Sequence, residues 1–347
     1  MSLAPILVFA YNRPDHLRKT LTWLSHNELA KESVLYLFCD GFKKDATVEQ
    51  VKKVISARAI AHELAICPAF KEIHFIERAE NLGLGTSIIT GVTEIIEKHG
   101  KCIVLEDDLE TSPFFLEYMN QCLDYYENRK SVFSISATSR PHPERFYPSD
   151  YPYDVYVSLT HRPTGWATWK DRWNQVDWNA DAYRIIRDNP AMKQAFNRLG
   201  ADYYDALAYQ QEKGQNVWSI RFALSHFVNH AVSICPIVSY INHIGWDSEA
   251  TNATGGANRW MFDKLADKKE IRFLDVLYED SRIINSWYSF SIPKRRSILG
   301  RAINYLGRKV FNRDEFVLKG RIYKWLWILF LLSASEVIIK GTILRKH

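Results

Sequence analysis

Three consecutive carboxylates follow an apolar run about a third of the way along the chain. Glu106, Asp107 and Asp108 come directly after the strand-like segment Cys102–Leu105, a few residues before an expected helix. Three neighbouring acids repel one another unless a cation lies among them. Carboxylate and diphosphate oxygens are the ligands that Mg²⁺ and Mn²⁺ prefer. The pattern favours a site for Mn²⁺ or Mg²⁺ over the alternative of a solvated acidic loop.

The segments around this motif alternate between strand-like and helical patterns. Near-continuous apolar runs predict strands buried on both faces, over Ile6–Ala10, Val34–Cys39, Ile73–Ile76, Cys102–Leu105 and Val132–Ser136. Helical patterns separate them, after Pro14, over Val48–Ala65, over Ser87–His99, and from an N-cap at Ser112 to Tyr126. This repetition predicts a doubly wound, mostly parallel α/β sheet.

Ligands of such a sheet bind beyond the carboxyl ends of its strands. Arg13 follows the first predicted strand and suits a phosphate. Asp40 follows the second, where it could accept hydrogen bonds from a ribose or a base, although Asp-Gly is also a common turn. The stretch Asn81–Gly85 follows the third and opens a helix, so its glycines allow close backbone approach to an anion. It lacks the third glycine of a dinucleotide fingerprint.

These motifs together resemble the nucleotide-diphospho-sugar transferases of GT-A fold. The opening Pro5–Arg13, Asp40, Asn81–Gly85 and the Glu-Asp-Asp-Leu-Glu run that begins at Glu106 carry the resemblance. The last motif is most similar to N-acetylglucosaminyltransferases that act on N-glycans and to related bacterial enzymes. Two later stretches also resemble the bacterial group, Gly165–Trp173 and Trp218–Phe222 followed by Asn242–Asp247. The resemblance spans roughly residues 4 to 250.

The resemblance implies an inverting, metal-dependent glycosyltransferase that uses a nucleotide donor, UDP in the first instance. Asp108 would ligate the metal most directly, with Asp107 beside it, and Asp107 and Glu106 would orient the ribose or hold metal-bound water. Asp40 would contact uridine and Arg13 a phosphate. The full donor-binding set is Ala10, Tyr11, Arg13, Asp40, Asn81, Gly83, Gly85, Glu106 and Asp107.

The catalytic base departs from the family pattern. Enzymes of this group commonly carry an Asp next to the Trp that matches Trp218, and this chain has Val217 and Ser219 there. Asp247 is the first candidate for the base, and Asp202 and Asp205 are weaker alternatives. Two other interpretations stay open: a nucleotidyltransferase that releases pyrophosphate, and a catalytically silent protein that binds nucleotide sugars or glycans.

Tryptophans cluster in the second half of the chain. Trp166, Trp169 and Trp173 recur at spacings of three and four, which predicts one helical face. That face is either a core stripe or a platform on which an acceptor sugar stacks. Trp166, expected at a loop-to-helix junction, is the first acceptor candidate, and Arg221 is the second.

Charge divides the chain further. The net charge of +5 combines a tail of +10 over residues 294–347 with a body of −5. The apolar run Trp325–Ile339 would form about 22 Å of helix, short of the roughly 30 Å needed to span a bilayer. A basic, Trp-rich segment of this length predicts peripheral contact with a membrane, or else a helix docked on the body. No nucleic-acid motif is present, so no nucleic-acid partner is expected.

Three domains follow from these patterns. Residues 1–137 would bind the nucleotide sugar, residues 138–293 would bind a glycan or lipid-linked acceptor, and residues 294–347 would form a helical extension that contacts the membrane. Five scattered cysteines and the absence of a basic segment before the first strand predict a cytoplasmic protein on the inner membrane face. Surface polysaccharide synthesis would suit that location.

Overall fold

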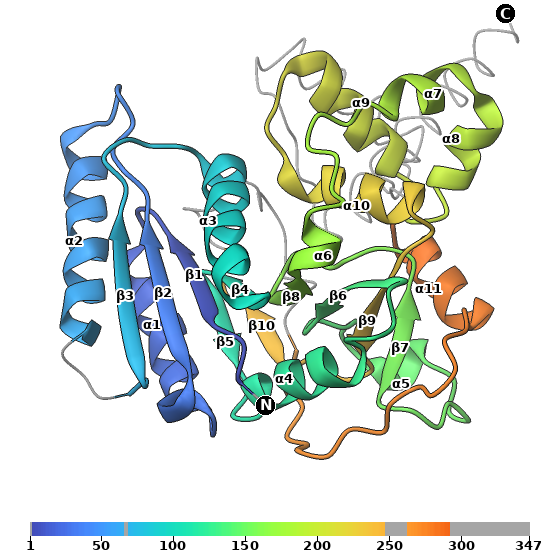
Figure 1. Ribbon diagram of the computed structural model, residues 1–347, viewed down its shortest axis with the longest axis horizontal. Coiled ribbons are helices and arrows are strands. Elements are labelled where there is room, and N and C mark those ends of the chain that lie inside the picture. Colours follow the sequence, from blue (N-terminus) through green and yellow to red (C-terminus); the bar gives the residue numbers. More distant parts are fainter. Residues whose placement is uncertain (1, 66–68, 247–261, 292–347) are drawn as a thin grey trace, which may run out of the picture. The chain divides into compact units, whose positions relative to one another are not determined.

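A computed structural model describes residues 2–65, 69–246 and 262–291 of the chain (Figure 1). Its strands are β1 (Ile6–Ala10), β2 (Val34–Cys39), β3 (Glu72–Glu77), β4 (Lys101–Glu106), β5 (Leu109–Thr111), β6 (Val132–Ser136), β7 (Val155–Ser158), β8 (Trp166–Trp169), β9 (Val232–Pro236) and β10 (Ile241–His243). Eight of these form one sheet in the order β3-β2-β1-β4-β8-β6-β9-β7, and β5 pairs with β10 in a separate ribbon.

The helices are α1 (Pro14–Ser25), η1 (Ala30–Glu32), α2 (Val48–Ala65), α3 (Leu84–His99), α4 (Phe115–Tyr125), α5 (Pro143–Phe146), α6 (Lys170–Trp173), α7 (Tyr183–Asp188), α8 (Pro190–Phe196), α9 (Tyr203–Lys213), α10 (Trp218–Val228) and α11 (Ser281–Ser291). Side chains of α1, α2 and α4 pack on one face of the sheet, and those of α3, α6 and α10 pack on the other. The predicted doubly wound α/β class is confirmed.

Strand direction determines which edge of the sheet carries the loops. β1, β2, β3 and β4 are mutually parallel, and β8 pairs antiparallel with both β4 and β6. β6 therefore runs in the same direction as β4, and its parallel partner β9 does too. β7 opposes β9. The sheet is mixed and mostly parallel, which fits the GT-A fold, and the carboxyl ends of six strands lie along one edge.

The ribbon of β5 and β10 follows β4 at this edge. Leu109 pairs with His243, and Glu110 pairs with Asn242. Residues more than 130 positions apart in the sequence thereby meet directly after the acidic turn. The sequence patterns predicted a helix after this turn and did not predict the ribbon.

Two local predictions are wrong. Trp166 and Trp169 belong to strand β8 rather than to a helix, and a strand places residues three apart on opposite faces. Trp166 accordingly packs with the α3 side of the sheet and Trp169 with the α1 side. Helix α4 begins at Phe115 rather than after an N-cap at Ser112, since the Ser112 carbonyl accepts the Phe115 N–H in a preceding turn.

Several sequence expectations concern other parts of the chain. Four cysteines are buried, namely Cys39, Cys102, Cys122 and Cys235. The basic tail and Asp247 lie outside the described residues. Within the described ranges, no helix combines the length and apolar character needed to cross a membrane.

Candidate functional site

A cavity of about 430 Å³ lies at the carboxyl ends of β1, β2 and β4, between the start of α3 and the end of β10. Most of the predicted donor-binding and metal-binding residues line it: Ala10, Tyr11, Arg13, Asp40, Asn81, Gly83, Glu106, Asp107 and Asp108. His243 and Gly245, which come from β10 and the residues after it, also line the cavity, as does Lys43. The structure therefore brings the acidic turn, a cationic side chain and a helix N-terminus to one space.

Asp108 is the most deeply placed acid of the turn. Its Oδ2 accepts a hydrogen bond from Arg13 Nη1 at 2.8 Å and lies 3.7 Å from His243 Nε2. Its Oδ1 is buried and has no hydrogen-bond partner among the described residues. A buried carboxylate oxygen without a partner is costly unless a ligand completes it. Asp108 thus pairs with Arg13 through Oδ2, and its Oδ1 can accept a bond from a ligand.

Asp107 and Glu106 lie beside it in the same turn. Asp107 Oδ2 accepts the Tyr11 N–H at 3.2 Å. The turn itself is held by Thr20 of α1, whose hydroxyl donates to the Asp107 carbonyl and accepts the Leu109 N–H. Burial, followed by the charge of Asp108, raises the pKa of both Glu106 and Asp107. A bound cation would offset the repulsion by Asp108, which is the second cause of both pKa shifts.

Asp40 anchors the loop that leads into α3. Its carboxylate accepts the N–H groups of Leu82 at 2.9 Å and Gly83 at 3.0 Å. Asn81 Nδ2 donates to the Gly41 carbonyl at 3.0 Å, which ties the same loop to the end of β2. The Gly41 N–H also donates to Asp40 Oδ1 at 3.1 Å. The structure therefore gives Asp40 a positioning role at the lining of the cavity.

Gly85 differs from its predicted role at the donor. It does not line the cavity, and a Cβ at this position would overlap the Asn216 backbone carbonyl. Asn216 Nδ2 also donates to Thr86 Oγ1 at 2.7 Å. Gly85 lets the segment before α10 pack closely against the start of α3.

Gly245 is a site residue that residue spacing alone did not reveal. A Cβ there would overlap Asp108 Oδ2 and lie 2.6 Å from Arg13 Nη1. Its carbonyl accepts Arg13 Nη2 at 3.2 Å, and the neighbouring Ile244 N–H donates to the Asp108 carbonyl at 2.9 Å. The only sequence signal was its place in the Asn242–Asp247 stretch.

The residues at the turn fit a cation that takes some of its ligands from the protein and the others from a bound substrate. Asp108 Oδ1 is available, and Asp107 lies next to it. No cluster of three or more His, Cys, Asp or Glu side chains is arranged as a complete metal site in the described ranges. Mg²⁺ is commonly held by one or two carboxylates, water and substrate phosphates. The site therefore matches a cation that binds together with a diphosphate.

The two exposed candidates for the base lie elsewhere. Asp202 and Asp205 are exposed at the start of α9, and neither lines the cavity. Among the described residues, the acids that line it are Asp40 and the three of the turn. The remaining candidate, Asp247, follows the cavity-lining residue Gly245 by two positions and lies outside the described residues.

The two acceptor candidates have structural roles. Trp166 is 1% exposed and stacks on Trp173 and Trp218, so its ring cannot receive a sugar, and this prediction is wrong. Arg221 donates to the Trp178 carbonyl at 2.7 Å and contacts the Asn216 side chain. It braces the segment before α10 and does not line the cavity.

No protein-family model and no curated protein matches the chain. Among solved structures, a mannosyltransferase (PcManGT) from Pyrobaculum calidifontis in complex with GDP-Man and Mn²⁺ is similar at 9% identity and a TM-score of 0.33. That match covers 49% of this chain and 45% of the mannosyltransferase. The galactosyltransferase LgtC, in complex with donor and acceptor sugar analogs, is similar at 11% identity and a TM-score of 0.34, over 71% of this chain and 91% of LgtC.

A UDP-glucose pyrophosphorylase complexed with UDP-glucose is also similar, at 11% identity and a TM-score of 0.34, over 67% of this chain and 90% of that protein. TM-scores this low carry no argument about chemistry.

Proposed function

We propose that this chain is an inverting, metal-dependent GT-A glycosyltransferase. It transfers a hexosyl or N-acetylhexosaminyl group from a nucleotide donor, UDP-linked in the first instance, to a glycan or lipid-linked acceptor. One observation supports this above all: the acidic turn after β4, Arg13 and the start of α3 line a single cavity at the carboxyl edge of the sheet. This combination suits a diphosphate that carries a cation.

Each residue of the cavity has a separate role in binding the donor and the cation. Arg13 and the N-terminal end of α3 offset the negative charge of the diphosphate, because a guanidinium and a helix N-terminus both favour phosphate oxygens. Asp108, with Asp107, would hold Mn²⁺ or Mg²⁺. When bound, such a cation acts as a Lewis acid that stabilises the departing nucleoside diphosphate. Asp40 keeps the loop at Leu82 and Gly83 in place for the donor.

Transfer also requires a base for the acceptor. In an inverting reaction the acceptor hydroxyl oxygen attacks the anomeric carbon opposite the leaving nucleotide while a carboxylate takes its proton. We assign that role to Asp247, because its segment continues from the lining residues His243 and Gly245. The basic tail is proposed to hold the enzyme at an anionic membrane surface, where acceptors for surface polysaccharides would be found.

A thermal-shift screen of nucleotide sugars with and without Mn²⁺ tests the proposal. We expect a UDP-sugar to raise the melting temperature, and EDTA or Asp108→Asn to abolish the rise. Asp124→Asn is the matched control, since Asp124 pairs with Lys101 outside the cavity. A product assay completes the test. Release of pyrophosphate from a nucleoside triphosphate would instead identify a nucleotidyltransferase, and UDP binding without turnover would identify a silent binding protein.

A further inference from the structure

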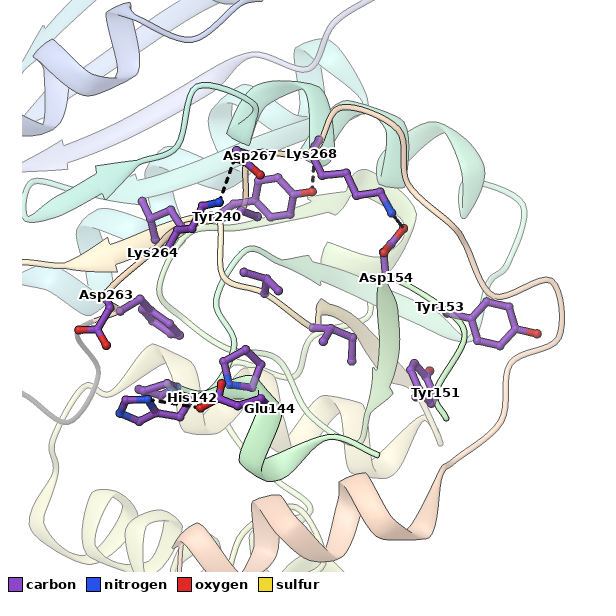
Figure 2. Close-up of a pocket in the computed structure, with 17 residues that line it drawn as sticks. His142, Glu144, Tyr151, Tyr153, Asp154, Tyr240, Asp263, Lys264, Asp267 and Lys268 are labelled. Atoms are coloured by element: carbon purple, nitrogen blue, oxygen red, sulfur yellow. Dashed lines mark hydrogen bonds and ion pairs between the residues drawn. The ribbon is translucent and has the colours of Figure 1, made fainter. Parts of the chain in front are cut away.

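A second and larger cavity, of about 680 Å³, lies beside the far half of the sheet (Figure 2). The loop after β6, the segment before β7, the β9–β10 connection and residues 262–268 form its walls. The 262–268 wall is fixed by hydrogen bonds. Phe262 N–H donates to Asn242 Oδ1 at 2.7 Å, and Ala266 N–H donates to the Ser239 carbonyl at 2.7 Å.

This cavity and the proposed donor cavity open on the same edge of the sheet. β6 and β9 run in the direction of β4, so the residues that follow them, Pro141–Glu144 and Ile237–Tyr240, lie at the carboxyl edge. The donor cavity occupies the same edge beyond β1, β2 and β4. Open α/β sheets bind their ligands along this edge.

Strand β10 connects the two cavities. Tyr240 lines the larger one and His243 lines the donor cavity. Three residues of extended chain span roughly 10 Å. A ligand that reaches from one cavity to the other would therefore be longer than a single sugar ring.

The lining of the larger cavity combines an apolar floor with a polar rim. Ile237, Val238 and Phe262 contribute apolar surface, and Val238 is 38% exposed. Glu144 and Asp263 lie at one end of this lining and Tyr153 lies at the other, with its hydroxyl directed outward (Figure 2). An apolar surface ringed by hydrogen-bonding groups suits a saccharide, whose C–H faces are apolar and whose edges carry hydroxyls.

The charges of the rim disfavour an anionic ligand. Lys268 Nζ lies 2.6 Å from Asp154 Oδ2, and Lys264 Nζ lies 3.2 Å from Asp267 Oδ2, so both lysines already face carboxylates. Figure 2 shows these pairs along one side of the cavity. Asp263 adds a further negative charge, whereas Glu144 lies 3.6 Å from Arg145 Nε and 3.7 Å from His142 Nδ1. A phosphate or uronate here would meet net negative potential.

We propose that this larger cavity binds a neutral oligosaccharide segment of the acceptor, at a distance from the point of transfer. The proposal rests on the glycosyltransferase function above and deepens it. A neutral glycan lies across the cavity, and its growing end passes along β10 toward His243. A lipid diphosphate, if the acceptor carries one, lies outside this cavity.

Val238→Arg tests the site in the full-length protein. The new side chain fills the floor of the cavity. Because Val238 is exposed, the substitution should leave the fold intact. Val276→Arg is the matched control, because Val276 is 73% exposed and lies outside the cavity. The probe is an array of neutral oligosaccharides together with sialylated and sulfated ones. The thermal shift given by UDP with Mn²⁺ is recorded for each protein.

The wild type and Val276→Arg are expected to bind neutral oligosaccharides, and Val238→Arg to bind them at least 10-fold more weakly, with an unchanged UDP shift. Equal binding by Val238→Arg, a preference for anionic glycans, or no array binding at all would overturn the proposal. Loss of the UDP shift in all three proteins would instead count against the glycosyltransferase function, whatever the array shows.

Discussion

Arg13 Nη1 lies 2.8 Å from Asp108 Oδ2, so a guanidinium covers the carboxylate that we assign to the cation. Both side chains are close to 90% buried, where solvent screens the pair only weakly. The Gly245 carbonyl accepts the second Arg13 nitrogen and keeps the guanidinium in place. Arg13 at Oδ2 and a divalent cation at Oδ1 therefore compete electrostatically for the charge of one carboxylate. A donor diphosphate relieves the competition, because it offers Arg13 a new anionic partner.

Arg13→Met should separate the effect of Arg13 on the cation from its effect on the diphosphate. Without the competing guanidinium, Mn²⁺ alone is expected to bind about 10-fold more tightly, while UDP binds about 10-fold more weakly, each about 1.4 kcal/mol. Isothermal titration of Mn²⁺ and of UDP measures both. Arg18→Met is the control, since its pair with Glu63 is more than half exposed. Weaker Mn²⁺ binding by Arg13→Met would show that Arg13 assists the cation rather than competing with it.

Gly245→Ala should weaken UDP binding, although it adds only one methyl group. The added Cβ would overlap Asp108 Oδ2 and crowd Arg13, so the end of β10 must move. Overpacking of this kind costs about 1–3 kcal/mol of stability, and UDP affinity should fall at least 10-fold. Gly100→Ala is the control. Gly100 has a φ of +78° and open space around it, so alanine strains the backbone there without touching the cavity. Equal UDP binding by both variants would contradict the assignment.

The affinity for the cation should rise with pH. The pKa values of Glu106 and Asp107 are raised by burial and by Asp108, so protons occupy the turn near neutral pH and must leave when a cation binds. Where one proton is released per cation, affinity increases about 10-fold per pH unit below the raised pKa. Mg²⁺ titrations between pH 6.0 and 8.5, in two buffers of different ionisation enthalpy, report both the slope and the proton count. A flat profile would show that the turn is already ionised.

Four strands of the main sheet could be predicted from sequence because they are buried on both faces. β1, β2, β4 and β6 are short apolar runs, and their ends follow from the polar residues next to them. Helix α3 ends at His99, and Gly100 follows as the predicted stop signal. These local signals were enough to place Arg13, Asp40 and Asp108 at one edge of a sheet.

Features that depend on distant pairing could not be predicted in this way. β8 is buried on both faces, so it shows no alternation, and its tryptophans fall by coincidence at helical spacing. β10 has three residues, and its pairing with β5 joins Asn242 to Glu110, 132 positions apart. The role of Gly245 follows from that pairing, since its importance comes from contact with Asp108 rather than from its neighbours in sequence.

Removal of residues 294–347 should release the protein from membranes. This segment has a net charge of +10 and carries the apolar run Trp325–Ile339. Sedimentation with vesicles that contain anionic lipid measures the effect, and neutral vesicles are the control. The shortened protein should stay in the supernatant and retain its UDP thermal shift. Continued sedimentation with anionic vesicles would place the membrane contact elsewhere.

Two buried histidines make the fold sensitive to acid. His226 Nδ1 donates to the Phe222 carbonyl at 2.8 Å, and its Nε2 lies 3.0 Å from Ser233 Oγ, which suits a neutral ring. His161 lies beside it, with ring centroids 5.7 Å apart, and neither of its ring nitrogens has a partner among the described residues. Burial lowers the pKa of His226 to about 4 and that of His161 well below its usual range.

Stability should therefore fall between pH 6.5 and about pH 4, because both histidines are protonated in the unfolded chain but stay neutral in the folded chain. Each histidine contributes about 1.4 kcal/mol per pH unit, or about 2 kcal/mol between pH 6.5 and 5.0. His226→Gln should reduce the difference in unfolding free energy between pH 7.5 and 5.0 by that amount, whatever its effect at pH 7.5. Urea unfolding at both values measures this difference. His26→Gln, at an exposed position, should leave it unchanged. An equal difference in His226→Gln and wild type would mean that His226 is protonated in the folded protein.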